Sequence, residues 1–366
     1  MTRVPGSIPN IITGFCKEVV IFTAMQVNKN IKIFINYFFG PLVFAWLAFS
    51  IYKNIQQQPQ LQVSWRQIQS SFQSVKIGYL LVAMLLIFVN WGIEAWKWKL
   101  SVAGFQSISF IQAFKAVLSG VTFSISMPNR IGEYLGRVLY LPEGSRLKTI
   151  SVTLVGSFAQ LLTTLITGAV GLIILKSRLI ALSSQMNLWY QFILYGLLGL
   201  IAVLAPIYFN VAGTVSLFRR WISHKKYLYL VESLSDFDTR LLLQVLLLSF
   251  LRYFVFVVQY ILIFYLFEVN VGAAVIACVM SVIFLAMAVV PSITLVEVGV
   301  RGEISLMLMG MFSANSLGIG LTSVTVWFMN LVIPAIIGSL LLLNIKVFKK
   351  RIHEKKNSTR QPVRQC

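Results

Sequence analysis

Residues 241–267 read LLLQVLLLSFLRYFVFVVQYILIFYLF and contain a single charged residue, Arg252. An apolar run of about 20 residues is long enough to cross the ~30 Å hydrocarbon core of a bilayer as an α-helix. The stretch therefore predicts a transmembrane helix with one arginine near its middle.

Comparable apolar segments fill most of the chain. Hydrophobic residues make up 58% and charged residues 11% of the 366 positions, far from the composition of soluble domains, and the mean hydropathy is +0.82. We predict an all-α, polytopic integral membrane helical bundle with about eight transmembrane helices plus one or two re-entrant or broken segments. The other segments are 31–52, 77–96, 107–127, 149–175, 188–209, 271–291, 296–313 and 317–345.

The net charge of +20 would suggest nucleic-acid binding in a soluble protein. Here the basic residues lie mostly between apolar runs and in the tail, where they orient the protein and meet anionic lipid headgroups. No nucleic-acid partner is expected. The three cysteines are unclustered and the two histidines lie in basic polar stretches, so neither a metal site nor a cofactor is expected.

Charge distribution sets the expected topology. The tail 346–366 has eight Lys/Arg and one acid, which predicts a cytoplasmic location. If 107–127 crossed the membrane, the N-terminal segment 1–30 (with Met25 as an alternative start) would lie outside against this rule. If 107–127 is re-entrant, both termini are cytoplasmic. We favour the re-entrant alternative, which implies a cavity that shields the buried backbone, within a transmembrane domain at 31–345.

Two stretches interrupt the apolar pattern with proline, glycine and charge: SMPNRIGEYLGR at 126–137 and PSITLVEVGVRGE at 291–303. Each places a glutamate four residues before an arginine, on one face of a helix. Such segments at corresponding places in two halves indicate a transporter binding site. The charge-based topology puts both stretches toward the cytoplasmic side, however, and so does not support an inverted repeat. Ordinary interfacial loops with solvated charges are the alternative. The pairs are Glu133/Arg137 and Glu297/Arg301.

Arg252 lies too deep in its segment to reach the headgroup region easily, and charge at that depth is costly. It therefore needs a carboxylate partner, for which the candidates are Glu133, Glu297 and Glu303. One reading is a structural ion pair. The other is a site for a lipid phosphate, which the planar guanidinium fits well.

Three motifs in order resemble the lysylphosphatidylglycerol synthase transmembrane-region family, also described as flippase-like. They are Glu94-Ala-Trp-Lys97-Trp98, Pro128-Asn-Arg130-Ile-Gly132-Glu133 with Arg137, and Pro291 with Gly299-Val-Arg301-Gly302-Glu303. The third has an extra residue between arginine and glutamate, so either Glu297 or Glu303 could match the family carboxylate. The soluble aminoacyl-transferase domain of the synthetase members is not expected here.

The resemblance implies a translocase for a phospholipid or a lipid-linked glycan in the plasma (inner) membrane, with arginines neutralising the phosphate. Alternatives are an intramembrane transferase acting on polyprenyl-phosphate or phospholipid, and a non-catalytic partner of an envelope glycosyltransferase. Whether the protein is an enzyme stays open, with a transporter favoured, and a homo-oligomer or an envelope-enzyme partner is expected. The substrate-binding candidates are Pro128, Asn129, Arg130, Gly132, Glu133, Arg137, Arg252, Pro291, Glu297, Gly299, Arg301 and Glu303.

Overall fold

A computed structural model of the chain describes residues 49, 52–53, 56, 61–125, 132–142, 146–181, 186–211, 213, 237–289 and 294–342. Regular structure in these ranges is entirely helical. The N-terminal segment 1–30, nearly all of the predicted span 31–52 and the tail 346–366 lie outside them.

The helices follow the apolar pattern closely. They are α4 (Leu61–Phe72), α5 (Ile77–Val102), α6 (Phe110–Ile125), α7 (Gly132–Val138), α8 (Arg146–Ile174), α9 (Lys176–Ile180), α10 (Met186–Phe209), α13 (Thr239–Leu266), α14 (Ala273–Val289), α15 (Thr294–Met309) and α16 (Ser316–Trp327), the last continued by a π-helical turn at Phe328–Val332.

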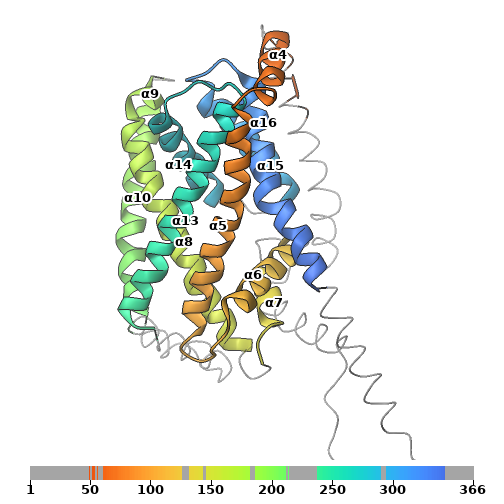
Figure 1. Cartoon of the computed structure of the whole chain (residues 1–366). Helices are drawn as coiled ribbons and strands as arrows, with labels where there is room; N and C mark the ends of the chain where they lie inside the picture. The colour runs from red at the N-terminus through yellow and green to blue at the C-terminus, as the bar shows by residue number, and fades with distance from the viewer. Residues whose placement is uncertain are drawn as a thin grey trace, which may run out of the picture.

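Helices α5 and α13 pack antiparallel against each other (Figure 1). Lys76, just before α5, forms an ion pair with Glu268, just after α13, with 2.6 Å between the charged atoms. Toward the other end, Lys97 Nζ of α5 donates to Ser249 Oγ of α13 at 3.5 Å. We call the end with Lys76 the upper end and the opposite one the lower end, as they appear in Figure 1.

Helices α6 and α7 form a first hairpin that enters and leaves at the lower end, between the end of α5 and the start of α8 (Figure 1). With 16 residues, α6 is about 24 Å long and shorter than the hydrocarbon core. The arms meet backbone to backbone, since a Cβ on Gly136 would lie 2.1 Å from the backbone nitrogen of Gly120. This arrangement agrees with the re-entrant interpretation of 107–127.

Helices α14 and α15 form a second hairpin that enters from the upper end. Asn315, which caps α16 directly after this hairpin, donates from Nδ2 to the carbonyl oxygen of Phe267 at 2.9 Å. The segment entering α14 and the segment leaving α15 therefore lie at the same end. Because α15 returns to the end at which α14 begins, 271–291 forms one arm of a hairpin, and the prediction of an ordinary span there is wrong.

The two hairpins thus enter from opposite ends, and the expectation that both charged stretches lie toward the cytoplasmic side is wrong. The order α5, α6–α7, α8 is repeated upside down as α13, α14–α15, α16. The positive-inside rule counts charges that face headgroups. Glu133, Arg137, Glu297 and Arg301 are instead turned into the protein. The expectation was wrong because it took 271–291 for a complete span, which put the stretch 291–303 at the lower end.

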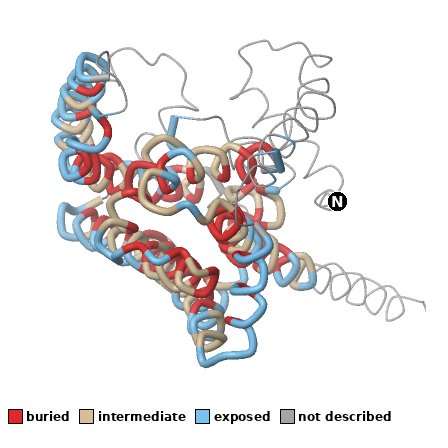
Figure 2. The backbone as a smooth tube through the Cα atoms, turned by 90° about the horizontal axis from the view of Figure 1, so that it is seen from above, coloured by how far each residue is buried: buried red, intermediate tan, exposed pale blue. Residues whose placement is uncertain are grey.

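Among the described residues, five helices are long and apolar enough to cross a membrane: Ile77–Val102, Lys148–Ile174, Asn187–Phe209, Thr239–Leu266 and Ser316–Leu342. Buried positions gather where helices face one another, and exposed positions lie around the periphery (Figure 2). Large apolar side chains occupy that periphery, for example Phe192, which is 74% exposed on α10. Lipid tails are a favourable environment for such a surface, and helices satisfy their own backbone there.

Candidate functional site

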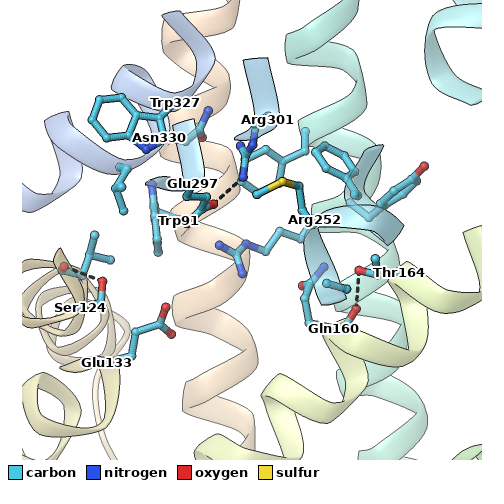
Figure 3. Close-up of a pocket in the computed structure, with 17 residues that line it drawn as sticks. Trp91, Ser124, Glu133, Gln160, Thr164, Arg252, Glu297, Arg301, Trp327 and Asn330 are labelled. Atoms are coloured by element: carbon cyan, nitrogen blue, oxygen red, sulfur yellow. Dashed lines mark hydrogen bonds and ion pairs between the residues drawn. The ribbon is translucent and has the colours of Figure 1, made fainter. Parts of the chain in front are cut away.

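A cavity of about 320 Å³ lies between the two hairpins (Figure 3). Arg252, in the middle of the 28-residue helix α13, lines it and so places it near mid-depth. Side chains from both hairpins and from α5, α8, α13 and α16 contribute to its wall. Its polar or amphipathic lining residues are Trp91, Ser124, Glu133, Gln160, Thr164, Arg252, Tyr253, Glu297, Arg301, Trp327 and Asn330.

Four predicted site residues line this cavity together: Glu133, Arg252, Glu297 and Arg301. Arg137 is buried behind the cavity and takes part in its ion pairs. Gly132 is the first residue of α7, Gly299 lies in the second turn of α15, and Glu303 lies further along α15 without lining the cavity. Pro128, Asn129, Arg130 and Pro291 lie outside the described residues.

On the second hairpin, Glu297 and Arg301 form the predicted pair on one face of α15, with 2.5 Å between carboxylate and guanidinium. Arg301 also donates to the hydroxyl of Tyr260 on α13 at 3.3 Å. Both charged side chains are nearly buried, at 8% and 12% exposure. The pairing explains how this segment carries charge at membrane depth.

On the first hairpin, Glu133 and Arg137 form the corresponding pair on α7, separated by 3.4 Å. Arg137 makes a shorter contact of 2.8 Å with Glu94 on α5. The hairpin is therefore tied to the α5–α13 pair through Arg137.

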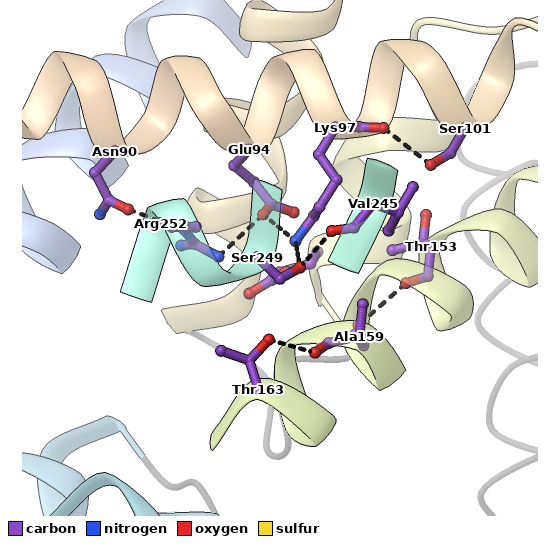
Figure 4. A network of polar contacts seen from close by, with 12 residues as sticks. Asn90, Glu94, Lys97, Ser101, Thr153, Ala159, Thr163, Val245, Ser249 and Arg252 are labelled. Carbon is purple, nitrogen blue, oxygen red and sulfur yellow. Dashed lines mark hydrogen bonds and ion pairs between the residues drawn. The ribbon is translucent and has the colours of Figure 1, made fainter. Parts of the chain in front are cut away.

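Glu94 is the centre of the largest charge cluster in the described part of the chain (Figure 4). Its carboxylate lies 2.7 Å from Lys97, 2.8 Å from Arg137 and 3.0 Å from Arg252, and its side chain is 6% exposed. Three cations share this one carboxylate, which offsets part of the cost of burying each of them.

The sequence argument missed Glu94 as the partner of Arg252, because it considered only the carboxylates of the two interrupted stretches. A signal was present. Glu94 and Lys97 form a charged i,i+3 pair within an otherwise apolar run, flanked by Trp91 and Trp98. Charges placed so far from a helix end usually have a partner.

The guanidinium of Arg252 is held on several sides. Its Nε donates to Asn90 Oδ1 at 2.9 Å, and Asn90 in turn donates to Asn330 Oδ1 at 3.0 Å. The rings of Trp91 and Phe256 lie 5.1 Å and 5.6 Å from its central carbon, within cation–π distance. Asn330 belongs to the π-helical turn after α16, a feature that often occurs at functional sites.

The remaining wall combines hydrogen-bonding and apolar groups. Gln160 and Thr164 of α8 line the cavity opposite Trp91 (Figure 3). Phe284 and Met287 of α14 supply apolar surface. The cavity is therefore amphipathic, and it places carboxylates and guanidinium groups near the membrane centre.

Among the described residues, no group of three or more His, Cys, Asp and Glu side chains could hold a metal ion. Fold and site together define a polytopic helical membrane protein with a charged cavity between two oppositely entering hairpins. The chain belongs to the lysylphosphatidylglycerol synthase TM region family, whose model matches residues 37–353. This membership indicates a membrane protein that acts on lipids. No curated protein matches the chain.

Proposed function

We propose that this protein binds a phospholipid or a lipid-linked glycan by its polar headgroup in the mid-depth cavity and moves it between the two leaflets. The observation that carries the proposal is the meeting of two oppositely entering hairpins at one charged cavity. A headgroup crossing the hydrocarbon core loses its water, at a cost of several kcal/mol or more. Polar groups preplaced at mid-depth replace that water and lower the barrier.

The ion pairs suggest how the empty cavity is kept stable. Glu94 holds Arg252, and Glu297 holds Arg301, while no headgroup is bound. A lipid phosphate can then accept hydrogen bonds from the same guanidinium groups, which favour phosphate geometry. Glu133, the most exposed of the paired carboxylates at 22%, can accept from a hydroxyl or an amine of the headgroup.

The hairpins provide a route to either side. Each is shorter than the bilayer core and is anchored at one end only. Movement of the lower hairpin would open the cavity toward the lower leaflet, and movement of the upper hairpin toward the upper leaflet. We assign the lower end to the cytoplasm of a plasma membrane, because the last described helix, Ser316–Leu342, ends there and the basic residues of 346–366 come next in the sequence.

The test is lipid flux in proteoliposomes that contain a fluorescent phospholipid, with an impermeant quencher reporting on the outer leaflet. Arg252→Gln and Glu133→Gln should each reduce the rate at least tenfold. Arg240→Gln is the matched control, because Arg240 lies on the same helix but is exposed at its first turn. If folded Arg252→Gln and Glu133→Gln proteins moved lipid at the wild-type rate, the proposed site would be wrong.

A second arm separates transport from chemistry. Purified protein in detergent has no leaflets, so a translocase should leave the lipid covalently unchanged. A new lipid product detected by mass spectrometry would overturn the translocase and indicate an intramembrane transferase.

A further inference from the structure

Two indole N–H groups of the cavity wall are buried without a hydrogen-bond acceptor. They belong to Trp91 on α5 and Trp327 on α16, and neither has a partner among the described residues. An indole nitrogen can only donate, and a buried donor that stays unpaired is costly. Groups of this kind in a cavity wall indicate the acceptor of a ligand.

The two tryptophans lie on the same side of the cavity, one above the other (Figure 3). The Nε of Arg301, which lines the same cavity, also has no acceptor among the described residues. This side thus presents three N–H donors without acceptors beside the carboxylate of Glu297, which already pairs with another nitrogen of Arg301. Unpaired donors are the groups that bind an oxyanion. Lower in the cavity lie Glu133, below Trp91, and Gln160, on the opposite wall (Figure 3), and Gln160 Oε1 is a buried acceptor without a donor among the described residues.

The ion pairs around the cavity indicate the charge of that oxyanion. In the described part of the chain, Lys97, Arg137, Arg252 and Arg301 form ion pairs with Glu94, Glu133 and Glu297. Glu303 adds a further carboxylate on the helix of Arg301, so the cations are largely compensated within the protein. A cavity with little uncompensated positive charge suits a phosphodiester, which carries one negative charge, better than a phosphomonoester or diphosphate, which carries about two.

We infer that Trp91 and Trp327, together with Arg301, form a phosphodiester-binding subsite, with Glu133 and Gln160 receiving hydroxyl or amine donors at the other end of the headgroup. This inference rests on the proposed lipid translocation and specifies its substrate class. The uncharged indole donors contribute hydrogen bonds without adding positive charge, so they favour a monoanion over a dianion. Lipids that end in a phosphomonoester or a diphosphate are then poor substrates.

Phenylalanine substitutions test the indole N–H groups while they keep an aromatic ring in place. Trp91→Phe and Trp327→Phe should each slow the flux of fluorescent phosphatidylglycerol about tenfold, the expected effect of losing a hydrogen bond to a charged group. Trp98→Phe is the matched control, because Trp98 is a buried tryptophan of α5 whose N–H also has no acceptor among the described residues, but it does not line the cavity. Wild-type protein should move phosphatidic acid, a phosphomonoester, at least tenfold more slowly than phosphatidylglycerol, and both cavity variants should narrow that difference.

Wild-type rates in both cavity variants would overturn the subsite. So would an equal loss in Trp98→Phe, or equal wild-type rates for the two lipids. Any of these results would leave the translocase itself intact.

A binding measurement covers the case in which the wild-type protein moves no lipid. Calorimetry of dihexanoyl phosphatidylglycerol binding in detergent should then show about tenfold weaker binding for Trp327→Phe than for Trp98→Phe. That outcome would support the subsite although the translocase proposal had failed. Equal binding by the two variants would overturn the subsite as well.

Discussion

The two hairpins have the same plan but are held in different ways. In the first, glycines bring α6 and α7 into backbone contact, and Arg137 ties α7 to the buried Glu94 cluster. In the second, the charged pair of Glu297 and Arg301 is contained within α15, and Arg301 also donates to the hydroxyl of Tyr260 on α13 at 3.3 Å.

This difference indicates that the two hairpins differ in how easily they can move. The ion pair of Arg137 with the buried Glu94 holds the first hairpin firmly, because movement of α7 would break it and leave the buried Arg137 with Glu133 alone. In the second hairpin the ion pair of Glu297 and Arg301 lies within α15, so this pair can move with the helix without being broken. We therefore expect the second hairpin to open more readily than the first.

The largest expected effect comes from Glu94→Gln. Three cations lose their shared carboxylate, so the free energy of unfolding should fall by about 3–5 kcal/mol, measured by denaturant titration in mixed micelles. Glu297→Gln serves as the comparison and should lower the free energy of unfolding by a smaller amount. If Glu297→Gln lowered the free energy of unfolding more than Glu94→Gln, the second hairpin and not the first would be the more firmly held one.

Gly136→Ala should loosen the first hairpin through packing alone. The new methyl group would meet the backbone of Gly120 at 2.1 Å, and such overpacking costs about 1–3 kcal/mol or more. Gly196→Ala on α10 is the control, because nothing lies within 4 Å of its Cβ position. Equal stability of the two variants, measured by the same titration, would argue against backbone contact between α6 and α7.

Glu297→Gln should act locally on the second hairpin. Loss of a charged hydrogen bond costs about 1.5–3 kcal/mol, and the effect should appear as faster hydrogen exchange in α15 with no change in α7. Faster exchange in both hairpins would mean that they move as one unit, contrary to the proposed difference.

The smallest effect concerns the upper end, where the second hairpin begins. Burial alone would raise the pKa of Glu268, but hydrogen bonds from Lys76 and Ser71 outweigh it and hold the pKa below its usual value. A carboxyl group with a lowered folded pKa contributes stability above its unfolded pKa of about 4.3, and this contribution is lost as pH falls through the folded value.

The contribution should be less than about 1 kcal/mol, because Lys76 is 42% exposed and solvent screens the pair. Thermal unfolding between pH 6 and pH 3 in detergent measures it. Lys76→Gln should flatten the pH dependence, whereas an unchanged profile would show that Glu268 gains nothing from this pair.

Much of the fold could be predicted from apolar segment length. The segments 77–96, 149–175, 188–209, 241–267 and 317–345 each correspond to one long helix, because the bilayer requires about 20 apolar residues per span. Composition could not separate a short span from half of a hairpin, so 271–291 was misread.

Only part of the site could be predicted, because only some of its contacts are between residues close together in the sequence. The i,i+4 pairs follow from helix geometry within a few residues of sequence, so Glu133/Arg137 and Glu297/Arg301 were found. The pairing of Arg252 with Glu94 joins residues 158 positions apart, and no local pattern specifies such a contact.

The membrane class, the long helices and the need of Arg252 for a partner follow from the sequence alone, because each depends on the cost of placing local groups in hydrocarbon. The choice of Glu94 as that partner depends on the antiparallel register of α5 and α13, and the opposite entry of the hairpins depends on the direction of the helices that precede them. The grouping of Trp91, Trp327 and Arg301 around one cavity likewise required distant segments to pack together, which only the tertiary structure decides.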